Sequence, residues 1–200
     1  MPAPTVSQPA PAFEAEAVMA DGTFGKISLD QFKGKKYVIL FFYPFDFTFV
    51  CPSEILAFHR LQGEFEKRGC QLLGVSVDSK FVHNAWRNLE LKEGGIGKIS
   101  FPLLADVSHK MAADYGVLLP EGMALRGLFL IDKDGVLQHS VVNNLPLGRS
   151  ADEALRMLDA LQHVEQYGEV CPANWRKGEK AMKATADGVK EYLGSSFTSN

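Results

Sequence analysis

The chain has 200 residues, of which 46% are hydrophobic and 22% are charged, and its formal net charge is −3. This is enough apolar material for one domain with a full core, and it excludes an intrinsically disordered chain. The small negative charge gives no electrostatic reason to expect nucleic acid or an anionic membrane as a partner. No apolar stretch approaches the roughly 20 residues that a membrane-spanning helix needs.

The three cysteines are too few for a disulfide scaffold in a chain of this size. The first residues, Met-Pro-Ala-Pro-Thr-Val-Ser-Gln-Pro, do not contain the basic region and apolar core of a secretion signal. An odd number of cysteines without such a signal indicates thiol chemistry plus a structural residue. We therefore expect a cytoplasmic protein.

Predicted strands and helices alternate along the chain. Residues 1–12 hold four of the ten prolines and are expected to form an extended arm. Strands are predicted in a hairpin at 13–27 with a turn at Asp21-Gly22, at 37–42, at 70–77, at 101–106, and in a second hairpin at 127–132 and 136–143. Helices are predicted as a short turn at 28–34, at 52–67, after Asp78 or Ser79, at 108–115, after Ser150, and at 179–193. This order predicts an α/β fold with a central mixed sheet flanked by helices and an N-terminal hairpin.

The pattern changes after Gly168. The stretch 169–176 has no helical period, and a Lys-Gly-Glu-Lys turn follows it at 177–180. The predicted helix at 179–193 is only weakly amphipathic, and the end of the chain is polar. We therefore predict two parts, a main domain over residues 1–168 and a C-terminal arm over residues 169–200.

Cys51 lies where a buried strand gives way to a helix. Apolar residues return every three or four positions after it, at Ile55, Phe58 and Phe65, and Pro52 fits the first helical position. The N-terminus of a helix offers unpaired N–H groups and a partial positive charge, both of which favour thiolate over thiol. Position alone also fits a small buried core residue, which is the commonest fate of a free cysteine.

The residues around Cys51 favour a reactive thiolate over a buried core residue. Pro44, Thr48 and Cys51 spell Pro-x-x-x-Thr-x-x-Cys, which resembles the active-site signature of peroxiredoxins. The longer stretch Phe-Tyr-Pro-Phe-Asp-Phe-Thr-Phe-Val-Cys-Pro-Ser-Glu is similar to that of the typical two-cysteine subgroup, and a second Val-Cys-Pro occurs at 170–172. The resemblance covers nearly the whole chain. It implies a thioredoxin-like fold and a peroxidase that reduces hydrogen peroxide and organic hydroperoxides.

Peroxide reduction by a thiol needs a thiolate and a means of stabilising the negative charge on the departing oxygen. Cys51 would supply the sulfur, the Thr48 hydroxyl would orient it or the peroxide, and Pro44 would shield it from water. Taken singly, Thr48 and Pro44 are better explained as ordinary loop residues; the signal is their common spacing. Arg126 begins the stretch Arg-Gly-Leu-Phe-Leu-Ile-Asp, which is similar to the family's arginine site, and is assigned to stabilising the thiolate and the transition state.

The resemblance also implies residues that support Arg126. Glu54, and Arg149 in the stretch Pro-Leu-Gly-Arg-Ser, look like the pair that orients its guanidinium. For Arg149, a solvated surface arginine is an equally good interpretation. No Gly-rich phosphate loop is present and the five histidines lack metal-ligand spacing, so neither a cofactor nor a metal is expected.

After the attack, Cys51 is a sulfenic acid that needs a second thiol. Cys70 lies in an apolar strand and is interpreted as structural, whereas Cys171 lies on the irregular arm beside Trp175 and is interpreted as the resolving thiol. In the resembled subgroup the resolving cysteine comes from the partner chain of a homodimer. The resemblance further implies that dimers assemble into a ring and that thioredoxin or a flavoprotein disulfide reductase reduces the disulfide.

The resemblance extends to regulation. Gly94-Gly95-Ile96-Gly97 and Tyr192 resemble the two elements that slow local unfolding in peroxide-sensitive members, in which phenylalanine follows the tyrosine; here Leu193 follows it. Two other functions are possible for a chain with this sequence. A dithiol exchanger would need Cys-x-x-Cys, but Glu54 occupies the second position. A holdase chaperone built on the same assembly is the alternative that the resemblance leaves open.

Overall fold

The computed structural model describes residues 3–197, and the chain divides into two compact units between Ala151 and Asp152. The first unit is built on a seven-stranded mixed sheet in the order β2-β1-β5-β4-β3-β6-β7. Its strands are β1 (Glu14–Val18), β2 (Phe24–Ser28), β3 (Tyr37–Phe42), β4 (Cys70–Ser76), β5 (Leu103–Ala105), β6 (Arg126–Ile131) and β7 (Leu137–Asn143). Strands β3, β4 and β5 are parallel, and the outer strands run antiparallel to their neighbours.

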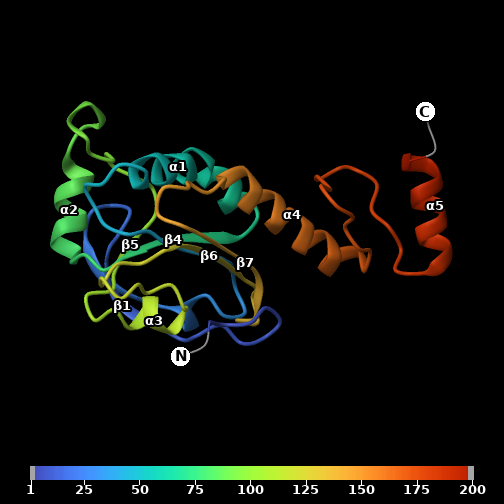
Figure 1. The fold of residues 1–200 in the computed structure, drawn as a ribbon, viewed down its shortest axis with the longest axis horizontal. Helices are drawn as coiled ribbons and strands as arrows, with labels where there is room; N and C mark the ends of the chain where they lie inside the picture. Colours follow the sequence, from blue (N-terminus) through green and yellow to red (C-terminus); the bar gives the residue numbers. More distant parts are fainter. Residues whose placement is uncertain (1–2, 198–200) are drawn as a thin grey trace. The chain divides into compact units, whose positions relative to one another are not determined.

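Three helices accompany this sheet: α1 (Cys51–Lys67), α2 (Lys80–Asn88) and α3 (Lys110–Asp114). Figure 1 shows α1 and α3 on opposite faces of the sheet, and α2 packs against β1 and β5. Short 3-10 turns lie at Leu29–Gln31 and Leu91–Glu93. The predicted α/β fold with a mixed sheet and an N-terminal hairpin is confirmed. None of the described helices is both long and apolar enough to cross a membrane.

Strand β3 is apolar at every position because both faces of the sheet are covered there. All six of its residues are buried. Successive side chains of a strand point to opposite faces, and the Phe41 ring stacks on Phe58 of α1 at 4.5 Å, while Phe42 lies 5.3 Å from Tyr115 on the other side. Such a strand reads as a continuous apolar run rather than an alternating one.

The antiparallel pairing of β3 and β6 places Arg126 near the end of β3. Phe41 lies opposite Leu128, so Arg126, two residues earlier on β6, lies beside the loop that leaves β3 and leads to Cys51. Gly127 allows close packing here, because a Cβ at this position would lie 2.7 Å from Val117 Cγ1. The register therefore brings two residues that are 75 positions apart in the chain to the same edge of the sheet.

Helix α4 (Ala151–Tyr167) begins with the last residue of the first unit, and its other residues belong to the second unit. An irregular segment and α5 (Ala186–Phe197) complete the second unit. The predicted start of the last helix at residue 179 is wrong. Val170 and Met182 exchange two backbone hydrogen bonds of 2.8 and 3.0 Å, which keep Met182 out of the helix. At the start of α5, the Thr185 hydroxyl accepts a hydrogen bond from Gly188 N. The compact units divide between residues 151 and 152, seventeen residues before the predicted boundary between the main domain and the C-terminal arm. That functional boundary, between residues 168 and 169, stays a prediction.

Other boundaries differ by little. Helix α1 begins at Cys51 instead of Pro52, so the cysteine itself is the first helical residue and the proline is the second. Ser79, one of the two predicted caps, accepts a hydrogen bond from Val82 N at 3.3 Å at the start of α2. Shifts of one or two residues at helix ends are usual, because the end residues are only half helical.

We predict that Cys70 is inert in the folded protein. It begins β4, its side chain is 1% exposed, and burial raises the pKa of its thiol to about 12. Because only the thiolate reacts, iodoacetamide near neutral pH should modify Cys70 at least about 100-fold more slowly in the native protein than in denaturant. Peptide mass spectrometry measures both rates. Similar rates in the two states would show that Cys70 is accessible and reactive.

Candidate active site

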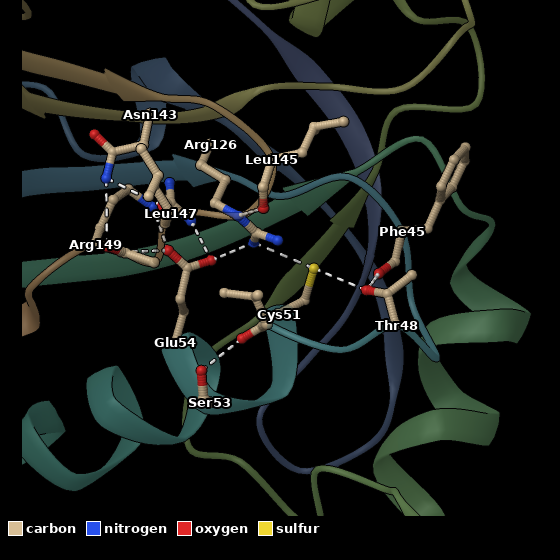
Figure 2. Close-up of polar contacts among 12 residues, drawn as sticks. Phe45, Thr48, Cys51, Ser53, Glu54, Arg126, Asn143, Leu145, Leu147 and Arg149 are labelled. Carbon is tan, nitrogen blue, oxygen red and sulfur yellow. Dashed lines mark hydrogen bonds and ion pairs between the residues drawn. The ribbon is translucent and has the colours of Figure 1, made fainter.

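The Cys51 sulfur sits at the start of α1 with two hydrogen-bond donors aimed at it. Its side chain is fully buried. The Thr48 hydroxyl lies 2.9 Å from Sγ and Nη1 of Arg126 lies 3.4 Å from it, so the sulfur is held between a loop residue and the first residue of β6 (Figure 2). Both contacts suit an anionic sulfur, because a thiolate can only accept hydrogen bonds.

The Thr48 hydroxyl can serve either form of the cysteine. It lies 2.8 Å from the Phe45 carbonyl oxygen as well as 2.9 Å from the Cys51 sulfur, yet it carries only one proton. With a thiol, S–H donates to the hydroxyl oxygen and the hydroxyl donates to Phe45. With a thiolate, the hydroxyl turns and donates to the sulfur. The Thr48 hydroxyl can therefore bond either form of the cysteine by rotation of its O–H bond.

Arg126 is fixed by bonds on two sides of its guanidinium. Its Nε donates to the Leu145 carbonyl at 2.6 Å, and its Nη1 donates to Glu54 Oε2 at 2.6 Å and to the Cys51 sulfur. The residue is 3% exposed. Within residues 3–197, the Nη2 atom of Arg126 donates to no acceptor. The two N–H groups of Nη2 are therefore the unused donors of this side chain.

Glu54 links Arg126 to Arg149. The Glu54 carboxylate accepts from Nε and Nη2 of Arg149 at 2.7 and 3.0 Å and from the Arg149 backbone N–H at 2.8 Å. Arg149 also donates to the Gly127 carbonyl at 2.6 Å and is buried, so the surface interpretation of this arginine is wrong. Burial acts to raise the pKa of Glu54, but the bonds and charge of Arg149, with Arg126, outweigh it and hold the pKa below its ordinary value.

A cavity of about 470 Å³ opens beside the two donors. Thr48 and Arg126 line it, and the remaining lining is almost entirely apolar: Pro44, Phe45, Phe49, Val50, Met123, Leu145 and Pro146. Pro44 is itself buried. A small molecule in this cavity would reach the Thr48 hydroxyl and the Arg126 guanidinium in an apolar setting, where hydrogen bonds are stronger than in water.

The loop that carries Thr48 is held by a buried polar cluster that sequence reasoning missed. Asp46 accepts from the Tyr43 hydroxyl at 2.8 Å, and its other oxygen lies 2.7 Å from Nδ1 of His83 on α2. His83 Nε2 lies 3.1 Å from the Leu104 carbonyl, to which it must donate, since a carbonyl only accepts. Burial raises the pKa of Asp46, while His83 opposes that shift.

The same loop contains a strained backbone position. Phe47 has φ of +56°, a conformation that is costly for a bulky residue. Its ring lies 5.8 Å from Trp86 of α2, so packing against that helix contributes to holding it. The Trp86 indole N–H in turn donates to the Gly94 carbonyl at 2.9 Å, which connects α2 to the glycine-rich loop predicted at 94–97.

The remaining predicted residues lie outside this site. Cys171 is in the second unit, half-buried, with its sulfur 3.6 Å from the Ala160 carbonyl, and burial raises the pKa of its thiol. Because Cys51 is in the first unit, their pairing stays a prediction. The same holds for the expected partnership of the glycine-rich loop with Tyr192, which is on α5. Within residues 3–197, no three acidic, histidine or cysteine side chains are grouped so that they could hold a metal ion.

We predict that Glu54→Gln destabilises the fold at neutral pH by about 3 kcal/mol, because it leaves two buried arginines without their carboxylate. The folded-state pKa of Glu54 is lowered, so its contribution is present above the unfolded pKa and is lost as pH falls through the folded pKa. The variant should therefore lose less stability than the parent on acidification. Urea unfolding at several pH values measures this.

Glu64→Gln is the matched control for that experiment. Glu64 lies on the same helix and bonds Lys67 and Arg68, but its side chain is 42% exposed, so its removal should have a much smaller effect. Equal losses for the two variants would show that the buried carboxylate has no special part in the stability of the site.

The chain is similar to known families, proteins and structures. Residues 6–140 match the AhpC/TSA family, and residues 160–195 match the C-terminal domain of 1-Cys peroxiredoxin. Peroxiredoxin-2 of Macaca fascicularis is 55% identical over 189 residues, 94% of each chain. Alkyl hydroperoxide reductase C of Helicobacter pylori strain J99 is 53% identical over 94% of this chain and 96% of its own.

A solved structure agrees with these matches. The reduced 2-Cys peroxiredoxin of Plasmodium vivax superposes with a TM-score of 0.94 and 53% identity, over 96% of this chain and 100% of that one. The matches cover both compact units of the chain. With this fold and this arrangement around Cys51, the chain belongs to the AhpC/TSA family, the peroxiredoxins.

Proposed function

We propose that this protein is a thiol-dependent peroxidase that reduces hydrogen peroxide and organic hydroperoxides through a sulfenic acid and an intersubunit disulfide. The observation that carries the proposal is the pair of donors, Thr48 and Arg126, that meet the Cys51 sulfur and also line an apolar cavity. A sulfur that is only structural would need neither donor.

In the first step the Cys51 thiolate attacks one peroxide oxygen in line with the O–O bond. A sulfur–oxygen bond forms, the O–O bond breaks, and the departing alkoxide or hydroxide takes a proton and leaves as alcohol or water. The sulfur is oxidised to the sulfenic acid. The unused Nη2 donors of Arg126 would stabilise the charge on the oxygens during this transfer, and Thr48 would orient the sulfur or the peroxide.

Supporting residues keep these groups in place. Glu54 and Arg149 hold the Arg126 guanidinium in one orientation through bonds of 2.6 to 3.0 Å. Pro44 has no N–H to donate, and from the lining of the cavity it would exclude water from the sulfur. Orientation by buried neighbours contributes to catalysis because the donors need not reorganise during the reaction.

In the second step Cys171 of a partner chain attacks the Cys51 sulfur, a disulfide forms, and the sulfenic oxygen leaves as water. Cys51 is fully buried in the first turn of α1, so this turn and the preceding loop must open before the two sulfurs meet. The strained conformation at Phe47 lowers the cost of that opening. In this proposal residues 1–168 form the peroxidase domain and residues 169–200 the arm that carries the resolving thiol.

Membership of the family supports a proposal for the assembly and the electron donor. We expect a homodimer that assembles into a ring of dimers in the cytoplasm, and reduction of its disulfide by thioredoxin or by a flavoprotein disulfide reductase. The H. pylori relative is named alkyl hydroperoxide reductase C, a name that supports the proposal of a reductase as partner. No observation on this chain favours the holdase chaperone over the peroxidase.

We predict that peroxide treatment produces a disulfide-linked dimer on a non-reducing gel, and that Cys51→Ser and Cys171→Ser each remove it. The reason is that each variant lacks one of the two sulfurs of the bond. Cys70→Ser is the matched control and should still form the dimer, because Cys70 is buried in β4. A dimer that persists in Cys171→Ser and disappears in Cys70→Ser would reverse the assignment of the resolving thiol.

A coupled assay tests turnover and identifies the electron donor. NADPH oxidation with hydrogen peroxide should be seen with thioredoxin and its reductase or with the flavoprotein reductase. Cys51→Ser should lower it by at least about 1000-fold, since the variant lacks the nucleophile. Absence of turnover with both donor systems, while the disulfide still forms, would reject both proposed reductants.

A further inference from the structure

One face of helix α4 holds the segment that carries Cys171. Nη1 of Arg156 donates to the Trp175 carbonyl at 2.9 Å, the Ala160 carbonyl accepts from the Cys171 sulfur at 3.6 Å, and the His163 ring lies 4.7 Å from the Trp175 ring. Residues 156, 160 and 163 are four and three positions apart, which places them on the same side of a helix. All these contacts lie within the second unit.

Arg156 is held firmly among these residues. Its Nε and Nη2 donate to the two carboxylate oxygens of Glu153 at 2.6 and 2.7 Å, and its side chain is only 20% exposed. The bond from Nη1 to Trp175 adds a third fixed point. A guanidinium bonded on three sides keeps its charge in one place, unlike a surface arginine whose side chain samples many rotamers.

The Trp175 carbonyl is a well-ordered acceptor for that arginine. Trp175 is 2% exposed, its backbone N–H donates to the Pro172 carbonyl at 3.1 Å, and its indole N–H donates to the Glu179 carbonyl at 3.0 Å. The turn from Pro172 to Trp175 is therefore closed, and Cys171 directly precedes it. By bonding the end of this turn, Arg156 holds the backbone next to the sulfur.

Two charged groups act on the Cys171 thiol. Burial raises the pKa of Cys171, the positive charge of Arg156 opposes the rise, and Glu169 adds to it. Glu169 lies 3.1 Å from His163 Nε2, and Glu153 is bonded to Arg156. Arg156 is thus the cation on α4 that favours the anionic form of this sulfur, while the neighbouring carboxylate on the sulfur's own segment disfavours it.

We propose that Arg156 is a positioning residue for the resolving cysteine: it holds the Cys171 turn through the Trp175 carbonyl and stabilises the Cys171 thiolate. This proposal rests on the proposed function of Cys171. The thiolate occurs twice in the cycle. It attacks the sulfenic sulfur, and the S–O bond breaks as the oxygen leaves with a proton as water. It is released again when a thiolate of the external dithiol attacks the Cys51 sulfur, and the electron pair of the broken S–S bond passes to Cys171.

The test measures the rate at which iodoacetamide alkylates Cys171 as a function of pH, in the reduced Cys51→Ser protein. Peptide mass spectrometry follows the alkylation. This readout needs no peroxidase turnover. Arg156→Gln should move the midpoint of the profile to higher pH and lower the rate near neutral pH roughly three- to fivefold, the effect of removing one screened charge at close range. Arg156→Lys keeps the charge and should largely restore the midpoint.

A purely structural role of Arg156 predicts a different result. Loss of the bond to Trp175 alone would expose the sulfur, and Arg156→Gln would then raise the rate at every pH without moving the midpoint upward; that result would overturn the proposal. Arg68→Gln is the matched control, because Arg68, the residue that follows α1, also bonds a glutamate four positions earlier but belongs to the first unit. Its profile should match that of the parent.

A second measurement separates this inference from the proposed function. In the protein with all its cysteines, Arg156→Gln should slow conversion of the sulfenic acid to the disulfide by a similar factor and leave the first reaction with peroxide unchanged. If Cys171→Ser still forms the disulfide-linked dimer, the resolving role fails, while the alkylation profile still decides whether Arg156 acts on Cys171. An altered profile with unchanged disulfide formation would overturn the role of Arg156 in resolution.

Discussion

The site depends on one buried carboxylate shared by two buried arginines. Glu54 carries one negative charge, and Arg126 and Arg149 carry two positive charges, so the three side chains leave one positive charge inside the protein. An unbalanced buried charge is costly. A thiolate at Cys51, 3.4 Å from Arg126, balances it. The carboxylate thus does two things: it permits burial of both arginines and leaves a charge that only an anionic sulfur or oxygen neutralises.

The topology of the sheet brings these three side chains together. Glu54 lies in the first turn of α1, Arg126 begins β6, and Arg149 follows β7. These three places meet because β3 leads into α1 while β6 runs antiparallel to β3, which brings the end of one strand beside the start of the other. With a parallel β6, residue 126 would lie at the opposite edge of the sheet. The contact between the Cys51 sulfur and Arg126 therefore depends on the direction of β6 as well as on the two residue types.

Local patterns in the sequence were sufficient to predict the strands, most helices and the placement of Cys51 at a helix start, because these depend on periodicity and on neighbouring residues. Contacts between distant positions were not predictable in this way. Asp46 and His83 are 37 positions apart, and no spacing rule pairs them. Arg149 looked equally suited to the surface, because burial of an arginine depends on a partner 95 positions away. The last helix began late for the same reason, since Met182 pairs with Val170 instead of joining the helix.

The bonds that Thr48 and Arg126 make to the Cys51 sulfur also oppose the second step of the proposed cycle. Thr48 and Arg126 bond the sulfur only while the first turn of α1 is formed, yet a buried sulfur cannot reach a second thiol. The loop must therefore be stable enough to assemble the site and weak enough to open. Its stability comes from the Asp46 cluster and from packing on α2, and the positive φ at Phe47 works against both. The rate of opening then depends both on the bonds that Thr48 and Arg126 make to the sulfur and on how firmly Trp86 of α2 holds Phe47.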